Sequence, residues 1–239
     1  MHQTAMANGE IFFKTYVSQI PSETIKLIEI GSQNVNGSLR SVAPSYIEYI
    51  GVDFVEGDGV DVILDDPYSL PFESNSADVI ISSSCFEHSE MFWLVFLEVL
   101  RVLKPHGLLY LNVPSNGQIH RFPVDCWRFY PDSGHALVTW AKHNGINARL
   151  LESYVSYQTV VIEDIAMGDT WNDFIGVFVK DDDHSSHYQA RVLDSKKDVY
   201  NASVYVNGGY QSLQVTHLPQ EEIKMRIIQN TWTNQLKIL

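Results

Sequence analysis

Short apolar runs, each bounded by turn-forming residues, recur along the first half of the chain. Each run has the length of a strand and is flanked by Gly, Pro, Asn, Asp or Ser. Helical or loop segments separate the runs. Strands that alternate with helices in this way predict an α/β fold with a doubly wound, mostly parallel sheet. The expected strands are 26–30, 48–53, 61–64, 78–82 and 108–113.

Three further segments are expected to be helical. Residues 9–20 have an amphipathic pattern that stops at a proline. Residues 89–103 are apolar on nearly every face, with Ser89 as a candidate N-cap and a Lys-Pro-His-Gly turn at the end. Residues 133–143 form the third helix. Because so apolar a helix needs a surface to cover it, residues 89–103 are expected to be buried or to form a homodimer interface.

The amino-acid composition of the chain changes after residue 113. Residues 114–134 are rich in Pro, Asn, His, Arg, aromatic residues and Asp, which is typical of a long functional loop. Two more strands, expected at 148–162 and 172–180, would complete a seven-stranded sheet. We therefore expect residues 1–180 to form one α/β domain.

The last 59 residues, 181–239, are expected to form an extension packed on or beside that domain. Residues 202–213 have the pattern of a hairpin with Asn207–Gly208 as its turn. A closing helix is expected near 219–230.

Composition excludes several classes of protein. The chain has 239 residues and a formal net charge of −13, which disfavours nucleic acid and anionic membranes as partners. Two cysteines cannot build a disulfide framework, and the nine histidines show no paired spacing, so no metal site is expected. No signal peptide or membrane-length apolar run is visible. A cytoplasmic protein is expected.

The first two strands carry candidate nucleoside-binding residues. The first run ends at Gly31 and turns through small polar residues to Gly37, which predicts a strand, a tight loop and the start of a helix. The second run ends at Asp53, 22 positions after Gly31, where a carboxylate can accept hydrogen bonds from a ribose diol. A nicotinamide-dependent oxidoreductase fits this pattern too, although Glu29 is an unusual residue inside its first strand.

Longer motifs give the chain a resemblance to a known family. Asp61–Phe72 ends in Leu-Pro-Phe, Ser76–His88 is a strand that leads to a Glu-His pair, and Leu100–Leu111 contains a Lys-Pro-His-Gly turn before a strand. Over residues 25–180 this order resembles the class I S-adenosylmethionine-dependent methyltransferases. The resemblance implies S-adenosylmethionine as cofactor. The cofactor-binding residues that it implies are Glu29, Gly31, Ser32, Gly37, Asp53, Asp66 and Ser83.

Two segments resemble one particular subgroup of this family. Residues 120–131 and the Asn-Gly-Ser-Leu-Arg sequence at 36–40 are similar to a subgroup often associated with glycosyltransferase and surface-polysaccharide functions. This similarity favours a saccharide or another polyhydroxyl acceptor. The expected function is O-methylation of a small polar acceptor. A non-catalytic methyltransferase-fold binding module remains the alternative.

Methyl transfer to a hydroxyl requires alignment of the acceptor and removal of a proton. His88 is the preferred general base because imidazole titrates near neutral pH, and His120 and Asp125 are its rivals. Arg121 and Arg128 could hold an anionic acceptor, and Trp127 could stack on a sugar face. The predicted catalytic residues are therefore His88, His120 and Asp125. The predicted substrate-binding residues are Arg121, Trp127 and Arg128.

Overall fold

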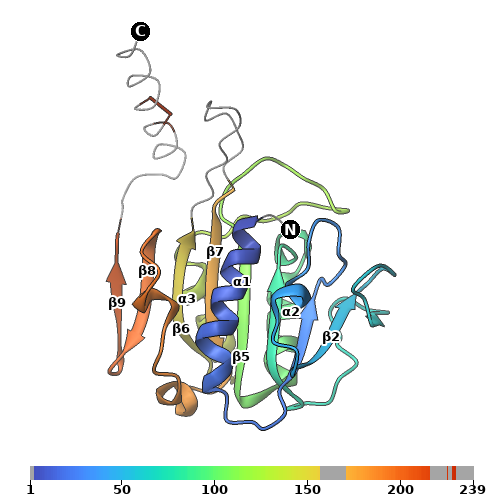
Figure 1. Cartoon of the computed structure of the whole chain (residues 1–239), viewed down its shortest axis with the longest axis horizontal. Helices are drawn as coiled ribbons and strands as arrows, with labels where there is room; N and C mark the ends of the chain where they lie inside the picture. The colour runs from blue at the N-terminus through green and yellow to red at the C-terminus, as the bar shows by residue number, and fades with distance from the viewer. Residues whose placement is uncertain (1–2, 157–170, 216–224, 226–227, 230–239) are drawn as a thin grey trace.

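The centre of the molecule is one nine-stranded sheet (Figure 1). A computed structural model describes residues 3–156, 171–215, 225 and 228–229. The strand order is β3-β2-β1-β4-β5-β7-β6-β8-β9. The strands are β1 (Lys26–Ile30), β2 (Glu48–Asp53), β3 (Val62–Ile63), β4 (Ala77–Ser83), β5 (Leu103–Pro114), β6 (Arg149–Ser156), β7 (Asp173–Val179), β8 (Val199–Val206) and β9 (Gly209–Leu213).

The sheet has a parallel half and an antiparallel half. From β3 through β5 neighbouring strands are parallel, with Ile28 opposite Ile80 and Ile80 opposite Leu109. From β5 to β9 every neighbouring pair is antiparallel. The prediction of a doubly wound α/β sheet is confirmed, but the count of seven strands is wrong. The β8–β9 hairpin adds two strands because β8 pairs directly with β6.

The predicted hairpin turn is confirmed. Asn207 and Gly208 both have positive φ angles, 50° and 83°, as a tight two-residue turn between twisted strands requires. The described part of the extension therefore continues the main sheet. The helix expected near 219–230, and the end of the strand expected at 148–162, lie largely outside the described residues.

Helices cover both faces of the sheet. Alternate residues of each strand point to opposite sides, so that Ile80 packs in one apolar cluster and Val79 in the other. Helices α2 (Phe92–Val102) and α3 (Ser133–His143) contribute to the first cluster, and α1 (Gln3–Tyr16) contributes to the second. Figure 1 looks onto the face that α1 covers.

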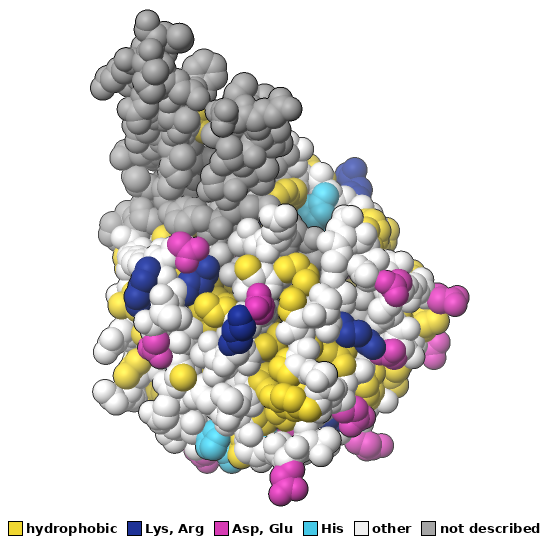
Figure 2. All heavy atoms as spheres, in the orientation of Figure 1, with side chains coloured by type: hydrophobic (Ala, Val, Ile, Leu, Met, Phe, Trp, Pro, Cys, Tyr) yellow, Lys and Arg dark blue, Asp and Glu magenta, His cyan; other side chains and the backbone are white. Residues whose placement is uncertain are grey.

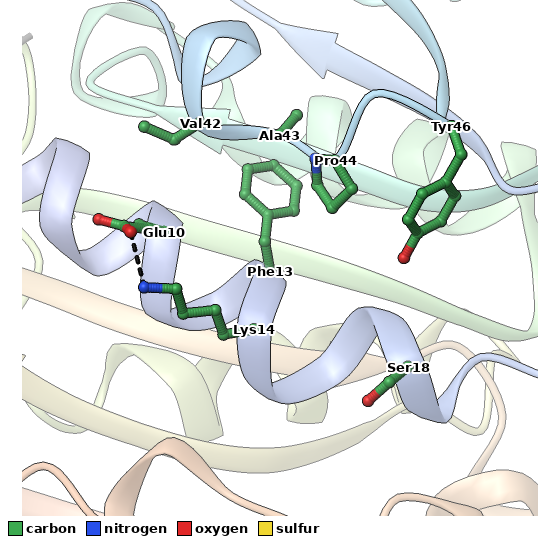
Figure 3. A pocket seen from close by; sticks show the side chains of 8 residues that line it. All are labelled: Glu10, Phe13, Lys14, Ser18, Val42, Ala43, Pro44 and Tyr46. Carbon is green, nitrogen blue, oxygen red and sulfur yellow. Dashed lines mark hydrogen bonds and ion pairs between the residues drawn. The ribbon is translucent and has the colours of Figure 1, made fainter.

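Helix α1 is fastened to the middle of the sheet. The ring of Phe12 stacks on Tyr110 of β5 at a centroid distance of 4.6 Å. The Tyr16 hydroxyl donates to the buried carboxylate of Glu152 on β6 over 2.7 Å. Figure 2 shows apolar side chains gathered on the same face, around α1. A pocket between α1 and the segment 42–46 is lined by no predicted site residue (Figure 3).

Three helix predictions need correction. Helix α1 begins at Gln3 rather than at residue 9, and α2 begins at Phe92 rather than at Ser89. Met91, not Ser89, occupies the N-cap position, and its side chain makes no cap hydrogen bond. After Gly37 the chain forms only the four-residue 3₁₀ turn η2 (Leu39–Val42) in place of a helix. Among the described residues, no helix is long and apolar enough to cross a membrane.

Strand order determines where ligands can bind. The chain runs outward from β1 to β3 and then returns to place β4 on the other side of β1. The carboxyl ends of β1, β2, β4 and β5 therefore meet at one edge, where the order reverses. Open α/β sheets bind their ligands in the crevice at such a reversal.

Candidate active site

The backbone of the turn after β1 packs closely against the neighbouring segments. Gly31 has a φ of +77°, and the amides of Gly31 and Ser32 donate to the Val52 carbonyl of β2 at 2.9 and 3.1 Å. A β-carbon at Gly31 would lie 2.6 Å from the Cβ and Sγ atoms of Cys85. A side chain therefore cannot occupy position 31 unless the segment after β4 moves. Sequence reasoning identified the glycine but not Cys85 as its reason.

Asp53 lies beside this turn, at the end of β2 as predicted. Its carboxylate accepts hydrogen bonds from the amides of Gln33, at 3.1 Å, and Phe54, at 2.8 Å. These two bonds fix the carboxylate and leave lone pairs for a ligand, since a carboxylate can accept about four hydrogen bonds. The contact with a ribose stays a prediction.

Glu29 is buried in β1 and belongs to a small polar network. The Tyr49 hydroxyl donates to its carboxylate at 2.7 Å, and the Arg40 guanidinium lies 4.7 Å from the centre of the Tyr49 ring. Burial raises the pKa of Glu29 to about 7, while the hydrogen bond from Tyr49 and the charge of Arg40 oppose this rise. Sequence analysis gave Tyr49 and Arg40 no role in the site. They could have been sought because an acid inside a buried strand needs hydrogen-bond or charge partners.

The other predicted cofactor residues differ in their surroundings. The Ser83 hydroxyl is buried at the end of β4 without a hydrogen-bond partner among the described residues. Ser32 is also buried, and its hydroxyl packs against Gly51. The Gly37 amide donates to the Asn34 side chain at 2.9 Å. Asp66 is exposed and accepts from the Tyr68 amide of its own turn at 2.8 Å, and no hydrogen bond among the described residues joins it to the others.

The loop of residues 115–131, called the acceptor loop because it carries the predicted substrate-binding residues, is anchored to the turn after β4. The amides of Cys126 and Trp127 donate to the Glu87 carbonyl at 2.8 and 3.2 Å. The Trp127 indole donates to the Ser89 carbonyl at 2.8 Å, and the Phe129 amide donates to the end of β5 at 2.9 Å. In Figure 1 this loop arches over one edge of the sheet. The loop thus brings its side chains to the end of β4.

A partly buried ion pair holds the acceptor loop together. The Arg128 guanidinium binds both oxygens of Asp125, at 2.6 and 2.8 Å, and donates to the carbonyls of Gln118 and Trp127 at 2.8 Å. The hydrogen bonds from Arg128 hold the pKa of Asp125 down to about 2. These bonds use four N–H donors of Arg128. Arg121 is exposed and has no hydrogen-bond or ion-pair partner among the described residues, so it is the freer cation of the two.

His88 and His120 come together where the acceptor loop meets the end of β4. Their ring centroids lie 4.9 Å apart, edge to face. The Nδ1 atom of His88 lies 2.5 Å from the Val124 carbonyl, which assigns the proton to Nδ1 and leaves a lone pair on Nε2. Burial lowers the pKa of His88, so the neutral ring is favoured near pH 7.

Glu87 completes this cluster and was assigned no catalytic role by sequence analysis. Its side chain is 1% exposed, and its Oε1 atom lies 3.7 Å from Nε2 of His88. Burial raises the pKa of this carboxyl to about 8. The Glu-His dipeptide was visible in the sequence, but the proximity of His120 depends on the path of the acceptor loop.

Part of the chain is similar to a known family. Residues 34–111 match the family model described as "Methyltransferase domain". A 79-residue segment is 37% identical to phthiotriol/phenolphthiotriol dimycocerosates methyltransferase 1 of Mycobacterium ulcerans. This match covers 31% of the chain and 25% of the relative, so the chain spans about a quarter of the length of that curated protein.

Solved structures share the fold at low sequence identity. The YcgJ protein of Bacillus subtilis aligns with 76% of this chain and all of its own, at a TM-score of 0.52 and 12% identity. The 1,6-didemethyltoxoflavin-N1-methyltransferase of Burkholderia thailandensis, solved with S-adenosylhomocysteine, aligns over 75% of this chain and 80% of its own, at 0.50 and 13%. The [4+2]-cyclase SpnF aligns over 75% and 82%, at 0.51 and 15%.

Residues 34–111 are therefore similar to a methyltransferase domain, and the fold is shared with solved structures that include a methyltransferase bound to S-adenosylhomocysteine, the product of the cofactor that the sequence resemblance implies. The residues at the strand ends fit that cofactor. The turn at Gly31 lets a ligand approach the backbone, and the Asp53 carboxylate can accept further hydrogen bonds. The buried Ser83 hydroxyl has no hydrogen-bond partner among the described residues. This similarity does not identify the acceptor.

Proposed function

We propose that this protein is an S-adenosylmethionine-dependent O-methyltransferase whose acceptor is a hydroxyl of a small polar molecule, in particular a sugar or glycoconjugate. The observation that carries the proposal is the orientation of His88. Its Nδ1 atom is held by the Val124 carbonyl, so its Nε2 lone pair is available five residues beyond the end of β4. A hydroxyl acceptor needs such a group because it must lose a proton during transfer.

S-adenosylmethionine, when bound, supplies a methyl group on a positively charged sulfur. The protein must then bind the cofactor, align the acceptor and accept or release its proton. We assign the Gly31 turn to the amino-acid part of the cofactor, Asp53 to the ribose hydroxyls and Ser83 to the rim of the same site. The fixed carboxylate of Asp53 and the unpartnered hydroxyl of Ser83 support these assignments.

Activation of the hydroxyl falls to the imidazoles of His88 and His120, which lie side by side. Asp125 is better suited to a positioning role than to a base. Its pKa is held down to about 2 by Arg128, and its Oδ2 atom accepts the backbone amide of His120 at 2.8 Å. Asp125 and Arg128 therefore keep His120 in place rather than touching the acceptor.

Several exposed side chains of the acceptor loop support a sugar acceptor. Phe122 and Tyr130 are each 56% exposed, and aromatic rings can pack on the apolar face of a sugar. Trp127 is partly exposed, although its indole nitrogen is already bonded to the Ser89 carbonyl. Arg121 could bind a carboxylate or phosphate on the acceptor.

The test has two stages. Calorimetry of the whole chain should detect binding of S-adenosylmethionine and none of NAD. Tritiated S-adenosylmethionine is then incubated with free sugars, sugar acids and nucleotide sugars, and with amine controls of matched size. We expect label on a hydroxyl oxygen. Binding of the cofactor without transfer to any acceptor would indicate a binding module, and label confined to nitrogen would refute O-methylation.

A further inference from the structure

Three side chains with metal-binding atoms meet beyond the carboxyl end of β4. They are Glu87 and His88 of the turn η3 (Phe86–His88) and His120 of the acceptor loop, and one ligand atom from each lies within 4.8 Å of the other two. The Nε2 atom of His88 lies 3.7 Å from the Oε1 atom of Glu87. Ligands bound to one ion at 2.0–2.2 Å lie roughly 3–4 Å apart. Small side-chain rotations would therefore bring all three onto one ion.

The carboxylate of Glu87 is the strongest sign of a missing ligand. Its side chain is 1% exposed, and neither oxygen has a hydrogen-bond partner among the described residues. A buried carboxylate without a partner is costly, so such a group stays protonated, is paired with another group or binds a metal. The nearby Arg128 is already committed to Asp125. A cation within the cluster would supply the partner that the protein does not.

Both imidazoles are oriented as metal-binding histidines are. The Nδ1 atom of His88 lies 2.5 Å from the Val124 carbonyl, and the Nδ1 atom of His120 lies 3.3 Å from the Gln118 carbonyl. Carbonyl or carboxylate partners on one ring nitrogen fix the tautomer and direct the lone pair of the other nitrogen at the metal. Asp125, 3.5 Å from Nδ1 of His120, adds a second such partner.

We infer that Glu87, His88 and His120 bind one divalent transition-metal ion. Two imidazole nitrogens and one carboxylate oxygen suit Zn²⁺, Fe²⁺, Co²⁺ or Mn²⁺ better than Mg²⁺ or Ca²⁺, which prefer oxygen ligands. Three protein ligands leave open coordination positions. Sequence analysis expected no metal because only the fold brings His120 to the Glu-His pair.

The role of the ion rests on the proposed function. An acceptor hydroxyl could occupy an open coordination position, where the ion would polarise its O–H bond. When that bond breaks, the electron pair stays on the oxygen that attacks, and the proton passes to water. His88 and His120 would then activate the acceptor through the ion rather than as free bases.

Binding of the metal alone tests the site. The full chain is treated with a chelator, dialysed and titrated with Zn²⁺ and Co²⁺ by calorimetry, and the visible spectrum of bound Co²⁺ is recorded. We expect one ion per chain. Glu87→Gln and His120→Ala should weaken binding by at least about 100-fold. His143→Ala, which removes an exposed histidine at the end of α3, is the matched control and should bind as the wild type does.

Circular dichroism checks that each variant is folded, and His120, at 40% exposure, is the safer of the two ligand positions to change. Absence of binding, or equal binding by His120→Ala and His143→Ala, would overturn the inference. Methyl transfer that persists after chelation, with no ion bound, would overturn the role assigned to the ion and leave the O-methyltransferase proposal intact. One ion per chain with no methylated hydroxyl would instead refute the proposed function and leave the metal site standing.

Discussion

Gly31 and Cys85 are in such close contact that a β-carbon at position 31 would lie 2.6 Å from both the Cβ and the Sγ atom of Cys85. The two residues follow neighbouring strands, β1 and β4, and both belong to the edge where the cofactor is expected. The contact therefore couples the cofactor turn to the segment that leads to Glu87 and His88.

Gly31→Ala should destabilise the protein more than its backbone conformation alone requires. A left-handed conformation costs a non-glycine residue about 1–2 kcal/mol, and the contact with Cys85 adds to that cost. Gly145 is a matched control, because its φ is +78° against +77° and nothing lies within 4 Å of its added Cβ. Urea unfolding should show a larger loss for Gly31→Ala than for Gly145→Ala. Cys85→Gly should restore part of the difference, and equal losses would contradict the prediction.

Asp53→Ala should weaken the binding of S-adenosylmethionine. Loss of hydrogen bonds to a charged acceptor costs about 1–3 kcal/mol, which is roughly a 5- to 150-fold increase in Kd. Calorimetry measures the change, with unfolding curves to confirm the fold. Asp66→Ala is the comparison, and we expect a smaller loss because Asp66 is exposed and bonded within its own turn. Unchanged affinity in folded Asp53→Ala would remove Asp53 from the ribose.

Glu29→Gln should stabilise the unliganded protein at neutral pH. Burial raises the pKa of Glu29 from 4.5 to about 7, so the folded state binds more protons than the unfolded state between those values. The free energy of unfolding must then fall as pH rises from about 4.5 to about 7, by a total on the order of 3 kcal/mol from this group. Gln keeps an acceptor for the Tyr49 hydroxyl and does not titrate.

Unfolding of wild type and Glu29→Gln at several pH values between 4.5 and 8 measures this contribution. Their stability difference should grow with pH in favour of the variant, whereas cofactor affinity should decrease if the carboxylate contacts the cofactor. A difference independent of pH would refute the assigned pKa.

Arg121→Ala and Arg128→Ala should have different effects. Arg121 is exposed, so its loss should raise the KM of an anionic acceptor and leave the unfolding midpoint unchanged. Arg128 holds the buried Asp125, so its loss should cost about 2 kcal/mol of stability and loosen the acceptor loop. Steady-state kinetics combined with urea unfolding separates the two roles. Cofactor affinity lost in either variant would show that the acceptor loop also binds the cofactor.

Local patterns predicted the parallel half of the sheet well. Buried strands such as Lys26–Ile30 and Ala77–Ser83 are apolar runs bounded by turn residues, and Asp53 was placed by its distance from Gly31. The Asn207–Gly208 turn was equally local, because both residues tolerate positive φ. Each of these features is decided by neighbours in the sequence.

Features that depend on contacts between distant segments were not predicted. The pairing of β8 with β6 joins residues about 50 positions apart, and no pattern in either strand specifies the other. The Arg128–Asp125 pair was interpreted as two separate functional groups, since the sequence does not show that they bind each other. The importance of Glu87 could not be predicted, because only the folded acceptor loop brings His120 beside it.

Helix α1 and strand β1 both lie ahead of residue 34, where the match to the methyltransferase family begins. Yet β1 is the strand that joins β2 to β4, and α1 covers the face formed by β5 and β6. A fragment cut at residues 34–111 would lack the strand that joins β2 to β4, and would end inside β5. The stretch by which the family is detected is thus smaller than the stretch that must fold, and fragments for expression should be chosen by the sheet.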